Sequence, residues 1–239
     1  MKKHLLLLPL LALAAPVAAQ HTELSGRAGL GLMQFGGKDA AYTSQINYSN
    51  YNGTVSGYTN SPYGSRLGVG FDVGGRVQRV GQRHTLLALD LGYDWLQSRT
   101  GISTLNYYDG SSNTPRPATG TSALRSQHLT SFLALGHRFG GSTVAVDVLL
   151  GPELAFVYGF HDKGSGTYDG GTAWSTDRPG REFNRFDGRL RADATAWKAQ
   201  LGFNASYSYG CINYQGGLVG GSREVYARVL RLGLAYRLR

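Results

Sequence analysis

The sequence predicts an all-β fold: an eight-stranded antiparallel up-and-down transmembrane β-barrel after an N-terminal signal peptide. Three observations support this prediction. The chain begins with a short basic and apolar leader, apolar residues then recur at every second position in eight segments, and the connections between those segments alternate between long and short.

The first 19 residues have the organisation of a secretory signal peptide. Lys2 and Lys3 precede an apolar run of 11 residues, Leu5 to Ala15, and small residues follow at Ala18 and Ala19. The run is about half of the roughly 20 residues that a membrane-spanning helix needs. We therefore expect residues 1–19 to be a signal peptide and residues 20–239 to form an outer-membrane β-barrel.

The composition favours strands and limits the partners. Glycine occurs 35 times and tyrosine 15 times, whereas the single cysteine, Cys211, allows no intrachain disulfide. The formal charge of +9 falls to +7 without Lys2 and Lys3. Because the signal peptide predicts export, nucleic acid is not expected as a partner, and lipopolysaccharide or internal salt bridges better explain the basic residues.

Eight segments show the period of a strand with two different faces. In the second, Leu67, Val69 and Phe71 alternate with glycine and charged residues. The alternation is weakest in the first, fourth and sixth segments. The eight segments cover residues 24–36, 66–74, 87–95, 125–139, 144–156, 183–193, 200–209 and 230–239.

The connections alternate in length along the chain. Long stretches rich in Tyr, Asn, Ser and Gly follow the first, third and fifth segments, and short turns follow the second, fourth and sixth. The predicted long loops are 37–65, 98–124 and 159–182, the short turns are 78–84, 140–142 and 192–196, and an intermediate loop covers 210–223. Short periplasmic turns and longer extracellular loops are typical of bacterial outer-membrane barrels.

Aromatic residues gather at the ends of the apolar faces. With a periplasmic N-terminus, the third, fifth and seventh segments run outward and carry aromatics at their outer ends. The predicted girdle at the two membrane interfaces comprises Tyr93, Trp95, Phe139, Phe156, Tyr158, Tyr207, Tyr209 and Tyr236.

The second face collects charges of both signs. Eight strands leave an interior just wide enough to be filled by side chains, so we expect these charges to pair as a network that plugs the lumen. An ion or proton path remains an alternative. The predicted network comprises Arg66, Asp72, Arg76, Asp90, Asp94, Arg138, Asp147, Glu153, Asp187, Arg189, Arg191, Asp193, Arg231 and Arg237.

Alternation alone does not establish which face is buried. A soluble exported barrel of the lipocalin type would turn its apolar face inward and bind an apolar ligand there. The loop alternation and the aligned aromatics favour the membrane barrel over this alternative.

Catalytic and metal-binding patterns are weak. A His-x-Ser pair typical of lipid A deacylases is absent, and His128 with Thr130 is the nearest arrangement. The loop from Asp162 to Gly170 resembles a calcium loop only loosely, because it lacks the terminal Glu. We therefore expect no enzyme activity, no metal site and no cofactor.

The layout resembles small outer-membrane β-barrels related to OmpX and the OmpA barrel, and the PorT-like proteins of the Bacteroidota. The signal peptide, the eight segments and the closing strand from Val229 to Arg239 carry this resemblance. Such barrels commonly end in an aromatic residue that the assembly machinery reads. This chain ends in Arg239, which leaves Tyr236 and Leu238 as the expected assembly signal.

The resemblance implies a non-enzymatic surface barrel with a role in surface binding or adhesion, envelope integrity or secretion support. The implied partners are outer-membrane lipid and lipopolysaccharide, the assembly machinery and an extracellular protein or surface that the tyrosine-rich loops contact. Two alternatives from other classes are an outer-membrane enzyme that modifies lipid A or phospholipid, and the soluble lipocalin-like barrel.

Overall fold

The computed structural model describes residues 21–51, 54–108, 110–141, 143–180, 185–216 and 224–238. The predicted signal peptide lies outside these residues. The described part is all-β, and it contains no helix long and apolar enough to cross a membrane. Its strands are β1 (His21–Gly36), β2 (Thr43–Tyr51), β3 (Thr54–Thr59), β4 (Arg66–Val80), β5 (Thr85–Tyr108), β6 (Asn113–Gly140), β7 (Val144–Tyr168), β8 (Thr172–Pro179), β9 (Phe186–Lys198), β10 (Leu201–Gly210) and β11 (Tyr226–Arg237).

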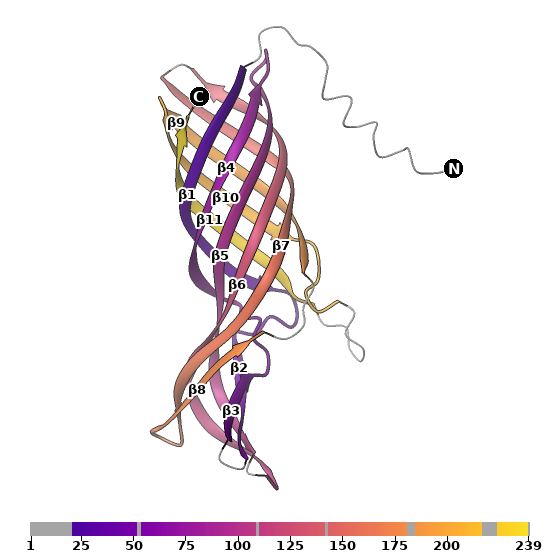
Figure 1. Ribbon diagram of the computed structural model, residues 1–239, viewed down its shortest axis with the longest axis vertical. Coiled ribbons are helices and arrows are strands. Elements are labelled where there is room, and N and C mark those ends of the chain that lie inside the picture. The colour runs from indigo at the N-terminus through magenta and orange to yellow at the C-terminus, as the bar shows by residue number, and fades with distance from the viewer. Residues whose placement is uncertain are drawn as a thin grey trace, which may run out of the picture.

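Eight of these strands close into a barrel (Figure 1). The order around the ring is β5-β4-β1-β11-β10-β9-β7-β6, and β6 pairs again with β5. Every pairing in the ring is antiparallel, including the seam where Ser25 lies opposite Arg237 and Gly36 opposite Tyr226. The predicted eight-stranded antiparallel barrel is therefore confirmed.

The apolar face of the barrel points outward. Side chains on the outer wall leave much of their surface accessible: 61% for Leu91, 67% for Leu135 and 70% for Leu234. Their neighbours along the strands, such as Asp90, are buried in the lumen. An apolar ligand cavity needs the opposite arrangement, so the lipocalin-like alternative is wrong.

The short turns lie at one end of the barrel, together with the chain end at β11 (Figure 1). They connect β4 to β5, β6 to β7 and β9 to β10. The predicted turn at 192–196 is wrong, because these residues lie inside β9 and the turn is at Ala199 and Gln200. Alanines occupy outward positions of β9, and their small side chains weaken the apolar alternation that marks a strand.

The three predicted long loops are largely strand. β2 and β3 lie within 37–65, the outer parts of β5 and β6 occupy most of 98–124, and β7 continues through 159–168 before β8. β2 pairs in parallel with β5, from Thr43 opposite Gly101 to Ser49 opposite Tyr108, so the fold is not purely up-and-down here. We call this extension the head; it comprises β2, β3, β8 and residues 101–108, 113–121 and 161–168.

The head has a small hydrophobic core of its own. Its buried members are Ile46, Ile102, Leu105, Ala118 and Trp174. Strands β3 and β8, at the two edges of the head sheet, approach each other, and Thr176 Oγ1 donates a 2.8 Å hydrogen bond to the carbonyl of Gly57. The head therefore wraps around its core at the end of the barrel opposite the short turns (Figure 1).

Candidate functional site

Inward side chains fill the barrel lumen with paired charges. Arg231 of β11 lies 2.6 Å from Asp94 and 3.2 Å from Glu153. Arg189 of β9 lies 3.2 Å from Glu153 and 2.6 Å from Asp187. All five side chains are 0–1% exposed, and such buried charges are tolerated only when they are paired.

A second group continues the network toward the short turns. Arg76 lies 2.6 Å from Asp90 and 2.9 Å from Asp193, and Arg191 forms close ion pairs with Asp193 and, at 3.3 Å, with Glu153. Each carboxylate therefore contacts more than one guanidinium, which suits the planar, multidentate donor geometry of arginine.

Arg27, which was not predicted from the sequence, pairs with Asp90 and lies 3.5 Å from Asp72. Arg27 is in the first segment, where Gly26, Gly29 and Gly31 obscure the alternation. The inward spacing from Ser25 to Met33 in β1 is the signal that could have identified it.

A third group closes the end of the lumen beside the short turns. Arg138 lies 2.6 Å from both Glu23 and Asp147, and Arg237 lies 3.3 Å from Glu23. Trp197 Nε1 donates a 3.0 Å hydrogen bond to Asp147. Glu23 was also missed, because β1 begins at His21, before the predicted start of the first segment.

Arg66 is the one residue of the predicted network that lies elsewhere. Its Nε donates a 3.0 Å hydrogen bond to the carbonyl of Tyr42, and its guanidinium carbon lies 4.0 Å from the centre of the Tyr42 ring. The β4–β5 register shifts between Leu67 and Phe71, so Arg66 leaves the lumen and lies where the barrel meets the head. The other members form ion pairs in the lumen: Asp72, Arg76, Asp90, Asp94, Arg138, Asp147, Glu153, Asp187, Arg189, Arg191, Asp193, Arg231 and Arg237.

An aromatic plug, which the sequence did not predict, closes the head end of the lumen. It consists of Phe35, Tyr63, Phe160 and Tyr214, with ring centres 5.1–6.3 Å apart. Tyr63 and Tyr214 come from connections between strands, where alternation gives no signal. The plug and the ion pairs occupy the interior that an ion path would need.

The predicted girdle residues lie on the outer wall in two bands. Near the head, the ring of Tyr93 lies 6.4 Å from that of Tyr158, and the ring of Trp95 stacks on Phe71 at 5.8 Å. Near the short turns, Phe139 and Tyr236 are about half exposed. The band near the head also contains Phe156, Tyr207 and Tyr209, together with Phe186, which was not predicted from the sequence.

No described histidine forms an accessible catalytic pair with a serine. His128 Nε2 lies 2.8 Å from Ser126 Oγ, but both side chains are buried in the lumen beneath the plug. The other ring nitrogen of His128, Nδ1, lies 3.3 Å from a guanidinium nitrogen of Arg189. Within the described residues, no three His, Cys, Asp or Glu side chains are grouped as a metal site.

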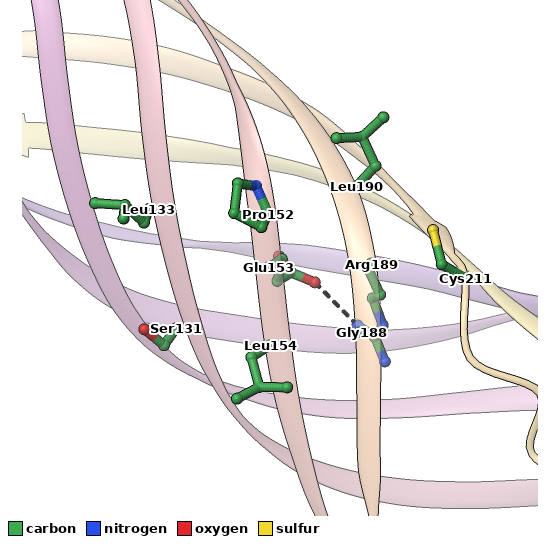
Figure 2. A pocket seen from close by; sticks show the side chains of 9 residues that line it. All are labelled: Ser131, Leu133, Pro152, Glu153, Leu154, Gly188, Arg189, Leu190 and Cys211. Atoms are coloured by element: carbon green, nitrogen blue, oxygen red, sulfur yellow. Dashed lines mark hydrogen bonds and ion pairs between the residues drawn. The ribbon is translucent and has the colours of Figure 1, made fainter. Parts of the chain in front are cut away.

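A groove of about 460 Å³ lies on the outer wall between β6, β7 and β9 (Figure 2). Glu153 and Arg189 contribute to its lining, but their charged groups are bonded to each other inside the lumen, at 3.2 Å. Its remaining lining residues are Ser131, Leu133, Pro152, Leu154, Gly188, Leu190 and Cys211. Ser131 and Cys211 thus have no histidine base beside them in this lining.

The head carries aromatic and charged side chains together. The Arg116 guanidinium lies 4.8 Å from the centre of the Tyr107 ring and 5.9 Å from that of Tyr168, and it forms a 2.6 Å ion pair with Asp169. The hydrogen bond to Asp169 raises the pKa of Arg116. Burial and the neighbouring Tyr168 and Tyr107 hydroxyls raise the pKa of Tyr48. This surface can stack on a ligand and pair with an anion.

Comparison with known proteins identifies no family. No family model and no curated protein sequence matches the chain. The solved structures that are similar over most of its length include Ail and Neisserial surface protein A. Ail, the attachment invasion locus protein of Yersinia pestis, solved with the heparin analogue sucrose octasulfate, has 15% identity and a TM-score of 0.36 and covers 91% of this chain and 99% of its own. Neisserial surface protein A has 13% identity and a TM-score of 0.36, and the match covers 90% of this chain and 98% of its own. These scores are too low to establish a shared fold, so the barrel assignment rests on the strand pairing.

Proposed function

We propose that this chain is an outer-membrane β-barrel of a Gram-negative bacterium. In this proposal, residues 1–19 are the signal peptide and residues 20–239 are the barrel domain. The observation that supports this proposal is the distribution of side chains across the barrel wall. Leucines and valines cover the outside of the barrel, whereas ion pairs fill its lumen. Exposing so much apolar surface to water is unfavourable, whereas a hydrocarbon environment solvates it well.

The aromatic bands support the same environment. Tyr and Trp rings favour the two membrane interfaces, and the bands lie at opposite ends of the apolar wall. In the band near the head, Arg125 lies over Trp95 and Arg228 over Tyr209, with guanidinium carbons 5.8 and 3.4 Å from the ring centres. Both cations are suited to lipopolysaccharide phosphates. Tyr236 and Leu238 are the proposed signal for the assembly machinery.

The head is the proposed surface-binding part of the molecule. It extends beyond the apolar wall and presents Tyr107, Tyr168 and Arg116, a combination that provides contact area and charge at low entropic cost. We propose a non-enzymatic role in adhesion, similar to OmpX-type barrels. Envelope integrity and secretion support, as in PorT-like proteins, are alternative proposed roles of the same barrel.

Heat-modifiability tests the membrane assignment. The protein is extracted from membranes in mild detergent, and its gel mobility is compared with and without boiling. We expect an SDS-resistant band that shifts on boiling. A soluble periplasmic protein without a shift would contradict the proposal.

A binding assay tests the head separately. Cells expressing the protein are applied to immobilised matrix proteins and glycans, and the Arg116→Ala and Tyr107→Ala variants are compared with Tyr42→Ala, an exposed tyrosine outside the cluster. The proposal predicts selective loss of binding in the first two variants. Equal binding in all three would exclude this surface.

A further inference from the structure

The groove on the outer wall is lined mainly by side chains of β6, β7 and β9 (Figure 2). Three outward positions on adjacent strands carry small or compact residues: Ser131 on β6, Pro152 on β7 and Gly188 on β9. Leu154 lies opposite both Ser131 and Gly188 in the strand register and separates them. The wall is therefore low at Ser131 and Pro152, whereas Leu154 stands between Ser131 and Gly188.

Leucines form the sides of the groove. Leu133, Leu154 and Leu190 line it and are each about half exposed. The volume of about 460 Å³ lies within the range of roughly 300–1,000 Å³ that small-molecule sites occupy. An apolar trough of this size on an apolar wall suits a hydrocarbon chain.

The segment after β10 forms one wall and holds the groove in shape. The Cys211 amide donates a 2.8 Å hydrogen bond to the Gly188 carbonyl. Ile212 reaches over Gly188, since a Cβ there would lie 3.0 Å from Ile212 Cδ1. Tyr214 then enters the barrel and donates a 2.7 Å hydrogen bond to Asp187. The groove is therefore preformed, which lowers the entropic cost of binding.

The groove lies toward the head end of the apolar wall. Leu154 and Gly188 are opposite each other, and the Phe156–Phe186 pair of the aromatic band follows two positions farther along the same strands. If the head is extracellular, the groove is at the depth of the outer leaflet.

We infer that this groove binds one acyl chain of an outer-leaflet lipopolysaccharide molecule. The inference rests on the proposed membrane function and adds a specific ligand site to it. Arg228 supports lipopolysaccharide as the source, because its guanidinium lies over Tyr209 and donates a 3.3 Å hydrogen bond to the Gly210 carbonyl, next to Cys211. A cation is thus available near the groove for a lipid phosphate.

A larger side chain in the groove tests whether the groove binds the acyl chain. Ser131→Leu places an apolar side chain in the groove, and Ala205→Leu, an outward alanine on β10 outside the groove, is the matched control. The full chain in detergent is titrated with purified lipopolysaccharide and analysed by native mass spectrometry. We expect a 1:1 complex for the wild type and Ala205→Leu, and about tenfold weaker retention for Ser131→Leu, equivalent to about 1.4 kcal/mol.

The single cysteine reports where the lipid binds. Lipopolysaccharide should slow maleimide modification of Cys211 in the wild type and in Ala205→Leu, but much less in Ser131→Leu. Equal retention and equal protection in all three proteins would overturn the inference. So would selective retention of added phospholipid, or oxidation to a Cys211-linked dimer that shows a second copy in the groove.

Gel mobility distinguishes a failure of the groove assignment from a failure of the proposed membrane function. If all three proteins keep the heat-modifiable band while the lipid results fail, the groove assignment is wrong and the membrane barrel stands. Loss of the band in the wild type would instead refute the membrane barrel itself.

Discussion

The hydroxyl of Tyr214 donates a 2.7 Å hydrogen bond to the Asp187 carboxylate, which also pairs with Arg189 at 2.6 Å. Tyr214 belongs to the connection after β10, whereas Asp187 and Arg189 point into the lumen from β9. This contact joins the aromatic plug to the ion-pair network. The aromatic plug and the ion-pair network are thus linked at Asp187.

Tyr214→Phe should therefore destabilise the barrel while leaving the aromatic plug in place. The ring still packs in the plug, but Asp187 loses one donor and keeps Arg189. We expect the free energy of unfolding to fall by about 1–2 kcal/mol, measured by urea titration in lipid vesicles. Tyr207→Phe, which changes an outward tyrosine, is the control and should have little effect. An equal loss in both variants would contradict the role of the hydrogen bond.

Arg231→Met should have a much larger effect. The substitution leaves Asp94 and Glu153 with fewer cations in a buried site, and breaking such a pair costs about 3–5 kcal/mol. Adding Asp94→Asn should recover part of the loss, because it removes one uncompensated charge. Folded protein is quantified by the unshifted gel band. Arg79→Met, on the outer face of β4, should leave that band unchanged.

Trp174→Ala should loosen the head and spare the barrel. Trp174 is buried in the head core, and truncating such a side chain costs about 3–5 kcal/mol. We expect faster protease cleavage within the head, with normal heat-modifiability. Tyr108→Ala, at an exposed head position, is the matched control. Loss of the folded barrel band in Trp174→Ala would show that the head and barrel do not fold independently.

The β7–β8 hairpin should weaken in acid. Hydrogen bonds from His161 and Lys163 lower the pKa of Asp177, so its stabilising contribution is present above the ordinary carboxylate pKa and is lost as the pH falls through the lowered value. The protection factors of the hairpin amides, which compare observed with intrinsic hydrogen exchange at the same pH, should fall below about pH 4. Asp177→Asn should abolish this acid dependence. An unchanged pH profile in that variant would exclude Asp177 as the titrating group.

The barrel could be predicted from the sequence because two-residue alternation is strong where one face is apolar and the other charged. Leu67, Phe71 and Leu91 made this pattern clear, and the lumen charges followed from it. Arg27 and Glu23 were missed because glycines blur the alternation in β1 and the strand starts earlier than predicted. The turn after β9 was misplaced for a similar reason.

The head and the plug could not be predicted in the same way. The head strands are rich in Tyr, Asn, Ser and Gly, and they become strands by pairing with extended neighbours such as β5. Tyr63 and Tyr214 reach the plug from connecting segments, so only tertiary structure brings them to Phe35. The groove likewise depends on residues from three strands and a following segment.

We propose that the apolar wall faces lipid, and this orientation can be measured. It is tested most directly by spin labels at Leu91→Cys and Leu135→Cys in a Cys211→Ser background, reconstituted in vesicles, with collision rates measured for oxygen and for a water-soluble nickel complex. We expect high oxygen and low nickel accessibility at both sites. High nickel accessibility at both sites in the folded protein would show that the wall faces water and would contradict the membrane barrel.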